Sequence, residues 1–91
     1  MNHTTVNPIV EIRLCVNSEL IESMKNNPLH HNQKISEVNG ERFLDFPIQI
    51  TPDFLHWIQC MGSSVEVIYP PELREWVRQN LTETLHKYRV V

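Results

Sequence analysis

The stretch over residues 51–77 constrains the fold most, because it predicts a helix, an abrupt stop, a short strand and a second helix in direct succession. Thr51 is placed to cap the first helix, and Pro52 suits its first position. Gly62 is placed to end this helix in a left-handed conformation, which glycine adopts at little cost. Two prolines, at 70 and 71, stop the strand and start the next helix. We expect the rest of the chain to pack around this unit.

The spacing of apolar residues changes at Gly62 from a helical repeat to an alternation. The helix before it has a wide apolar face made of Phe54, Leu55, Trp57, Ile58 and Met61. The strand after it alternates Val65, Val67 and Tyr69, expected on the buried face, with Glu66 and Ile68. The last helix is predicted over residues 71–88, with a buried stripe of Leu73, Trp76, Val77, Leu81, Leu85 and Tyr88.

The chain before residue 51 predicts a strand, a short helix and a hairpin. The strand over residues 9–16 points Val10, Ile12, Leu14 and Val16 inward and Glu11, Arg13 and Cys15 outward. A helix over residues 19–26 follows, capped by Asn17 or Ser18, and residues 29–33 form a loop. Strands over residues 34–38 and 42–50 are joined by Asn39-Gly40, since both positions of this turn need positive φ.

The strand over residues 42–50 points Leu44, Phe46, Ile48 and Ile50 inward and Phe43, Asp45 and Gln49 outward. Pro47 lacks an N–H, which predicts a bulge or an unpaired position there. The element order is therefore βαββαβ plus a C-terminal helix, which predicts an α+β, ferredoxin-like sandwich. Its antiparallel sheet has the strand order fourth, first, third, second. Residues 9–91 make this one domain, and residues 1–8 are expected to be a loose tail or linker.

Composition limits the classes of function. The chain has 91 residues and a net charge of −3, which argues against indiscriminate binding to duplex nucleic acid or anionic membranes. Two cysteines, Cys15 and Cys60, are too few for a disulfide framework, and nothing in the sequence is typical of a secretion signal or a membrane span. We therefore expect a cytoplasmic protein.

Two groups of polar residues are candidate contacts for a ligand or nucleic acid. The first is His30, Gln33, Lys34 and Arg42, expected to cluster at one end of the hairpin and to contact phosphate or a polar ligand. The second is Arg74 and Arg78, one helical turn apart, which either grip phosphates or pair with a partner's carboxylates. The competing interpretations are a solvated loop and a solvated helix face with intrahelical ion pairs.

Catalytic and metal sites have little support. Neither cysteine has an orienting third group or an oxyanion hole, and the motifs of nucleotide-binding loops are absent. The adjacent His30 and His31 are expected to point apart, and no further ligand follows at metal spacing. We expect no enzyme activity, no cofactor and no metal.

Short motifs spread over the chain resemble the C-terminal extension of WYL-domain transcription regulators, the WCX domain. They are Leu55-His56-Trp57-Ile58, Met61-Gly62-Ser63, Val65-Glu66-Val67 and Pro70-Pro71-Glu72-Leu73-Arg74. Leu29-His30 with Gln33, the hairpin around Gly40 and the last helix ending in Tyr88 also match. The resemblance covers about Ile9 to Tyr88.

The resemblance implies a bacterial regulator in which a helix-turn-helix domain reads DNA and a WYL domain senses a ligand, often single-stranded DNA. This domain would support homodimerisation and the response to ligand. Neither a helix-turn-helix nor the W-Y-L tripeptide occurs here, so we expect the chain to be part of a longer protein. Two alternatives stay open: a free-standing module that binds a small ligand, and a purely structural dimerisation domain.

Overall fold

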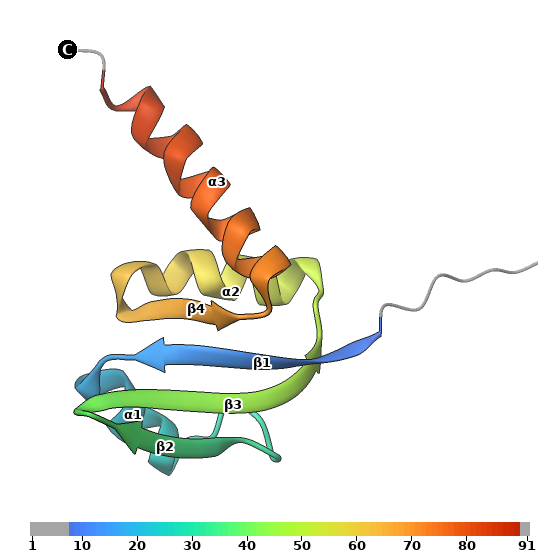
Figure 1. The fold of residues 1–91 in the computed structure, drawn as a ribbon, viewed down its shortest axis with the longest axis vertical. Helices are drawn as coiled ribbons and strands as arrows, with labels where there is room; N and C mark the ends of the chain where they lie inside the picture. Colours follow the sequence, from blue (N-terminus) through green and yellow to red (C-terminus); the bar gives the residue numbers. More distant parts are fainter. Residues whose placement is uncertain (1–7, 90–91) are drawn as a thin grey trace, which may run out of the picture.

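The computed structural model describes residues 8–89, so all but the last residue of the predicted tail over residues 1–8 lies outside the described residues. The elements, in chain order, are β1 (Ile9–Val16), α1 (Ser18–Asn26), β2 (Lys34–Val38), β3 (Glu41–Gln49), α2 (Pro52–Met61), the 3₁₀ turn η1 (Gly62–Ser64), β4 (Val65–Tyr69) and α3 (Pro71–Lys87) (Figure 1). This is the predicted order of strands and helices.

The four strands form one antiparallel sheet in the order β2-β3-β1-β4, which confirms the predicted α+β class and strand order. β1 and β3 are the central strands, and β4 and β2 form the two edges. Side chains alternate along β1 as predicted: Ile12, Leu14 and Val16 are buried. One face of the sheet therefore forms the core, and the other, which we call the open face, carries Glu11, Arg13 and Cys15.

α1 and α2 both pack on the apolar face of the sheet. They contribute the buried residues Ile21, Met24, Phe54 and Ile58 to the same cluster that contains Ile12, Leu14, Leu44 and Phe46 of the central strands. Phe46 and Phe54 meet edge to face, with ring centroids 6.0 Å apart. The core is thus a single layer between the sheet and these two helices.

Local capping follows the sequence closely. Asn17, rather than Ser18, caps α1, since its Oδ1 accepts a hydrogen bond from the amide of Leu20 at 2.8 Å. Thr51 caps α2 in the same way, accepting from the amide of Phe54 at 3.2 Å. Gly62 ends α2 with φ 56° and ψ −130°, a conformation open to glycine but outside the left-handed helical region that the sequence predicts.

The extra residue in the sheet lies in β4 and not at Pro47. Pro47 is opposite Glu11 in an uninterrupted β1–β3 register, so no bulge occurs there. β2 pairs with β3 only as far as Asp45, so Pro47 is unpaired on the β2 side, which is the other outcome that the sequence predicts. In the β1–β4 register Leu14 is opposite Val67, but Arg13 is opposite Tyr69, so one additional residue of β4 forms a bulge. This bulge turns Tyr69 toward the open face, where it is 53% exposed. The prediction that Tyr69 is buried is therefore wrong.

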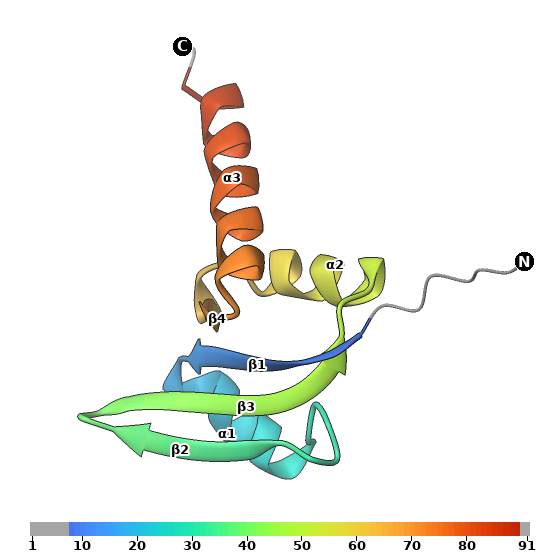
Figure 2. The same cartoon turned by 45° about the vertical axis from the view of Figure 1, so that its right-hand side comes forward.

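α3 leaves the body of the domain after its first turns, as Figures 1 and 2 show. Leu73 is buried and Val77 packs against the core, but Leu81, Leu85 and Tyr88 are 62%, 63% and 78% exposed. The prediction of a fully buried stripe is wrong for this second half, because the helix extends beyond the sheet edge and α2. Both views show α3 rising from the β4 edge, so it does not lie over the open face of the sheet.

Candidate functional site

A cleft of about 620 Å³ lies beside residues 29–33. We call it the loop cleft, and its lining residues are Glu11, Asn32, Gln33, Lys34, Asp45, Phe46 and Pro47. Its size lies within the range of small-molecule sites, although it is open on one side. Its walls carry one ammonium group, two carboxylates and two amides.

Gln33 shapes the loop that borders this cleft. Its side-chain Oε1 accepts hydrogen bonds from the amides of Leu29 and His30, at 2.8 and 3.2 Å, and its Nε2 donates to the carbonyl of Met24 at 3.1 Å. Both ends of the Gln33 amide are therefore engaged in joining the loop to the end of α1. Gln33, which the sequence predicts as a ligand contact, therefore stabilises the loop.

His30 is held between the loop and the core. Its ring stacks on His31 at 4.5 Å and on Phe46 at 6.0 Å, measured between centroids. The prediction that the two adjacent histidines point apart is therefore wrong. Its Nδ1 accepts a hydrogen bond from the amide of Asn32 at 3.0 Å. These contacts fix the ring beside the buried Phe46 and leave it half-buried, and His30 is not among the residues that line the loop cleft.

The structure does not bring Lys34 and Arg42 together. Lys34 is opposite Asp45 and Arg42 is opposite Glu37, so the two cations lie on opposite faces of the sheet, about 10 Å apart along the strands. Lys34 lines the loop cleft, whereas Arg42 lines a smaller hollow beside Ile21 and Lys25 of α1. The predicted four-residue cluster is therefore wrong as a single site, because strand alternation separates its two cations.

The open face of the sheet has balanced charges. Arg13 donates two hydrogen bonds to the carboxylate of Asp45, at 2.8 and 2.9 Å, and its guanidinium lies 5.0 Å from the centre of the Phe43 ring. The hydrogen bonds and charge of Asp45 raise the pKa of Arg13. Because Arg13 neutralises Asp45 and the acidic Glu11 lines the same cleft as Lys34, this face does not form the positive track that binds a nucleic-acid backbone.

The second hollow, which we call the β4–α3 groove, has a volume of about 390 Å³. It is lined by Gly62, Ser63, Val65, Glu66, Val67, Arg74, Val77, Arg78 and Leu81. Arg74 bridges its two walls, since its Nη1 donates to Glu66 Oε2 at 2.8 Å and to the Val67 carbonyl at 2.7 Å. The groove has valines inside and charged side chains at its rim.

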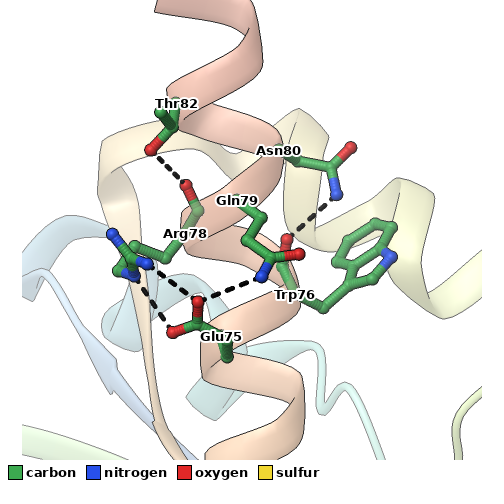
Figure 3. Close-up of polar contacts among 6 residues, drawn as sticks. All are labelled: Glu75, Trp76, Arg78, Gln79, Asn80 and Thr82. Atoms are coloured by element: carbon green, nitrogen blue, oxygen red, sulfur yellow. Dashed lines mark hydrogen bonds and ion pairs between the residues drawn. The ribbon is translucent and has the colours of Figure 1, made fainter.

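Arg78 forms an ion pair within α3. Figure 3 shows its guanidinium donating to both oxygens of Glu75, at 3.0 and 2.8 Å, while Gln79 donates to the same carboxylate. These hydrogen bonds, chiefly that from Arg78, lower the pKa of Glu75. Arg74 and Arg78 thus lie one turn apart, as predicted, but each pairs with a carboxylate of its own chain. For Arg78 this is the intrahelical pair that the competing interpretation predicts.

Groups suited to catalysis or metal binding are sparse. Among residues 8–89, no three His, Cys, Asp or Glu side chains lie together as a metal site. Cys60 Sγ lies 3.3 Å from His56 Nε2 on the exposed side of α2. None of the helices within residues 8–89 has an apolar stretch of the length that a membrane span requires.

The fold and these surfaces define a small α+β domain with a mixed-charge cleft and an apolar groove at one sheet edge. The family model described as the WCX domain matches residues 8–85, so the chain belongs to the WCX domain family. This membership connects it with transcription regulation, as a regulatory C-terminal module of WYL-type regulators, and not with an enzyme family. A search of curated proteins found no match.

Sequence reasoning missed several residues of these surfaces. Asn32 and Glu11 line the loop cleft, and Val65 and Val67 line the β4–α3 groove. Strand alternation predicts the outward face of Glu11, but only the folded loop brings it toward Asn32. No sequence pattern indicates the groove, because alternating valines on a strand are typical of the hydrophobic core.

Proposed function

We propose that this WCX domain is the ligand-response and dimerisation module of a bacterial WYL-type transcription regulator, working in the cytoplasm beside a WYL domain and a helix-turn-helix domain of the same chain. The family match over residues 8–85 is the observation that carries this proposal. The acidic net charge supports a role through these neighbouring domains and not independent binding to DNA.

The loop cleft is the part of this domain that we assign to the ligand. Lys34 supplies an exposed ammonium, and Asn32 lies beside it in the cleft wall. A phosphate of a single-stranded oligonucleotide held by the WYL domain would accept a hydrogen bond from the Lys34 ammonium. Glu11 in the same cleft repels further phosphates, which limits the contact to one.

The response follows from how two modules sit relative to each other. A ligand that contacts the WYL domain and the loop cleft together favours one arrangement of the paired modules. That arrangement biases the spacing of the two DNA-reading domains. Gln33 has an indirect part in this scheme, because its three hydrogen bonds hold the loop that carries Asn32 in place.

The test compares single variants of the complete regulator, with operator affinity measured at increasing concentrations of a single-stranded oligonucleotide. Lys34→Ala should raise the oligonucleotide concentration needed for half of the response about five- to tenfold, because a solvent-screened ammonium–phosphate contact contributes about 1 kcal/mol. Lys25→Ala is the matched control, since Lys25 pairs with Glu22 on α1 away from the cleft. An unchanged response in Lys34→Ala would exclude the loop cleft from the ligand site.

The Arg42→Ala variant distinguishes between ligand sites on the two faces of the sheet. Because Arg42 lies on the α1 side, its removal should leave the response unchanged if the ligand occupies the loop cleft alone. A loss of response in Arg42→Ala but not in Lys34→Ala would move the ligand to the α1 side of the hairpin.

A further inference from the structure

The second half of α3 exposes an apolar stripe that continues the β4–α3 groove. Leu81, Leu85 and Tyr88 are spaced by four and three residues, so they lie on one face of the helix. Val77 and Arg78, one turn earlier on the same face, line the groove together with Leu81. One continuous face of α3 therefore borders a hollow at its start and is exposed to solvent at its end.

The groove and the stripe are complementary in character. The groove has Val65, Val67 and Val77 inside and no side chain of residues 8–89 filling it. The stripe has large apolar side chains that nothing in the described chain covers. Apolar surface rimmed by charged residues is typical of protein interfaces. A surface that carries both a groove and the side chains to fill it is self-complementary, as the interface of a two-fold dimer must be.

We propose that two copies of this chain pair through α3 in antiparallel orientation, with Leu81 at the two-fold axis and with Leu85 and Tyr88 of each copy in the β4–α3 groove of the other. This inference rests on the proposed function, in which two modules pair, and names the surface they use. Val77 and Leu85 lie four residues to either side of Leu81, and Arg74 and Tyr88 lie seven. Antiparallel pairing about Leu81 therefore places Leu85 against Val77, and Tyr88 against the Arg74 guanidinium.

The charges of α3 favour this orientation. Its last turn carries the basic residues His86 and Lys87, while its first turn carries the acidic Glu72. Antiparallel pairing brings the basic last turn of each helix to the acidic end of its partner and opposes the two helix dipoles. A parallel pair would place Lys87 beside Lys87 and leave both grooves empty.

The size of the helix sets the expected affinity. α3 has 17 residues and spans about 25 Å, so one helix face and one groove per copy make an interface at the low end of the specific range. We expect a dissociation constant of about 1–100 µM. Pairing should then depend on the concentration of the chain.

The test is sedimentation equilibrium of the 91-residue chain between about 1 µM and 1 mM. The mass should rise from 10.8 kDa to about twice that value. Leu85→Asp should stay monomeric throughout, because an exposed charge replaces the side chain that fills the groove. Gln79→Asp, which places the same charge on the opposite face of α3, should still pair. Circular dichroism checks that both variants keep the fold.

Two results would overturn the inference. If Leu85→Asp pairs as well as the unchanged chain, the modules meet through another surface, and the proposed function survives without this interface. If the unchanged chain stays at 10.8 kDa up to the highest concentration, both this interface and autonomous pairing of the module are excluded. The assignment of the loop cleft is then judged separately, by the Lys34→Ala experiment.

Discussion

Arg74 of α3 is tied to Glu66 of β4, with 2.8 Å between Nη1 and Oε2, and the same nitrogen donates to the neighbouring Val67 carbonyl at 2.7 Å. This link attaches the helix to the sheet edge, so Arg74→Ala should lower the free energy of unfolding by about 1 kcal/mol. Urea unfolding followed by tryptophan fluorescence measures it. Arg78→Ala is the matched control one turn later: its intrahelical pair with Glu75 is exposed, and its urea midpoint should not change measurably. Equal effects of the two variants would contradict the tie between α3 and β4.

Gln33 should matter more for folding than its polar character suggests. Gln33→Ala removes three hydrogen bonds in a half-buried loop and should cost about 1–3 kcal/mol of stability. Gln33→Glu should also destabilise, because a carboxylate cannot donate to the Met24 carbonyl. Gln79→Ala, on the exposed face of α3, should change stability by less than about 0.5 kcal/mol. A Gln33→Ala protein as stable as this control would show that the loop holds without the amide.

The two halves of α3 should respond differently to truncation of a leucine. Leu73→Ala empties a buried position and should cost about 2–4 kcal/mol, measured by thermal unfolding at low protein concentration. Leu85→Ala should leave the unfolding of the monomer nearly unchanged, since its side chain is 63% exposed. A large loss of monomer stability in Leu85→Ala would mean that the second half of α3 packs on its own domain.

The two thiols should differ in reactivity. Burial, with Glu41 and Glu66 as smaller causes, raises the pKa of Cys15, while Cys60 is exposed. Less thiolate forms on Cys15 at any pH near neutrality, so iodoacetamide should label Cys60 first and Cys15 only slowly. Peptide mass mapping over a pH series checks this, with urea-unfolded protein as the control in which the difference disappears. Labelling of Cys15 as fast as Cys60 in the folded protein would contradict its partial burial.

The same shift has a consequence for stability. Because the pKa of Cys15 is higher in the folded chain than in the unfolded chain, the neutral thiol makes its full contribution to folding stability below the ordinary thiol pKa. This contribution is lost as the pH rises through the pKa of Cys15 in the folded chain. Cys15→Ser should therefore remove part of the alkaline decline in stability, measured by urea unfolding above neutral pH. An unchanged alkaline decline would assign it to other groups.

Local patterns predicted much of the fold, because caps and turns act over a few residues. Thr51, Asn17 and the turn at Asn39-Gly40 bind their own neighbours and need no knowledge of the tertiary structure. Strand order followed from the element order and the rules of short, right-handed connections. These features follow from residues that are close in sequence and from the order of the elements.

Errors arose where one element depends on another. Tyr69 continues the alternation of β4, but the bulge beside Arg13 turns it to the open face, and no residue of β4 marks that bulge. Leu81 and Leu85 continue the helical stripe of Leu73, but they lie beyond the sheet edge, so nothing in the domain covers them. A periodic stripe predicts that a surface will be covered and cannot say by which chain. Likewise, Lys34 and Arg42 are close in sequence yet separated by the pleat.

The antiparallel pairing of α3 is tested most directly by a cysteine at Leu81, in a chain whose Cys15 and Cys60 are replaced by serine. At the two-fold axis, Leu81→Cys places two thiols within the distance that a disulfide spans, so mild oxidation should give a covalent dimer at concentrations where the chain pairs. Gln79→Cys, on the opposite face, should stay monomeric under the same conditions. Equal cross-linking of the two variants, or none by Leu81→Cys in a chain that sediments as a dimer, would contradict pairing about Leu81.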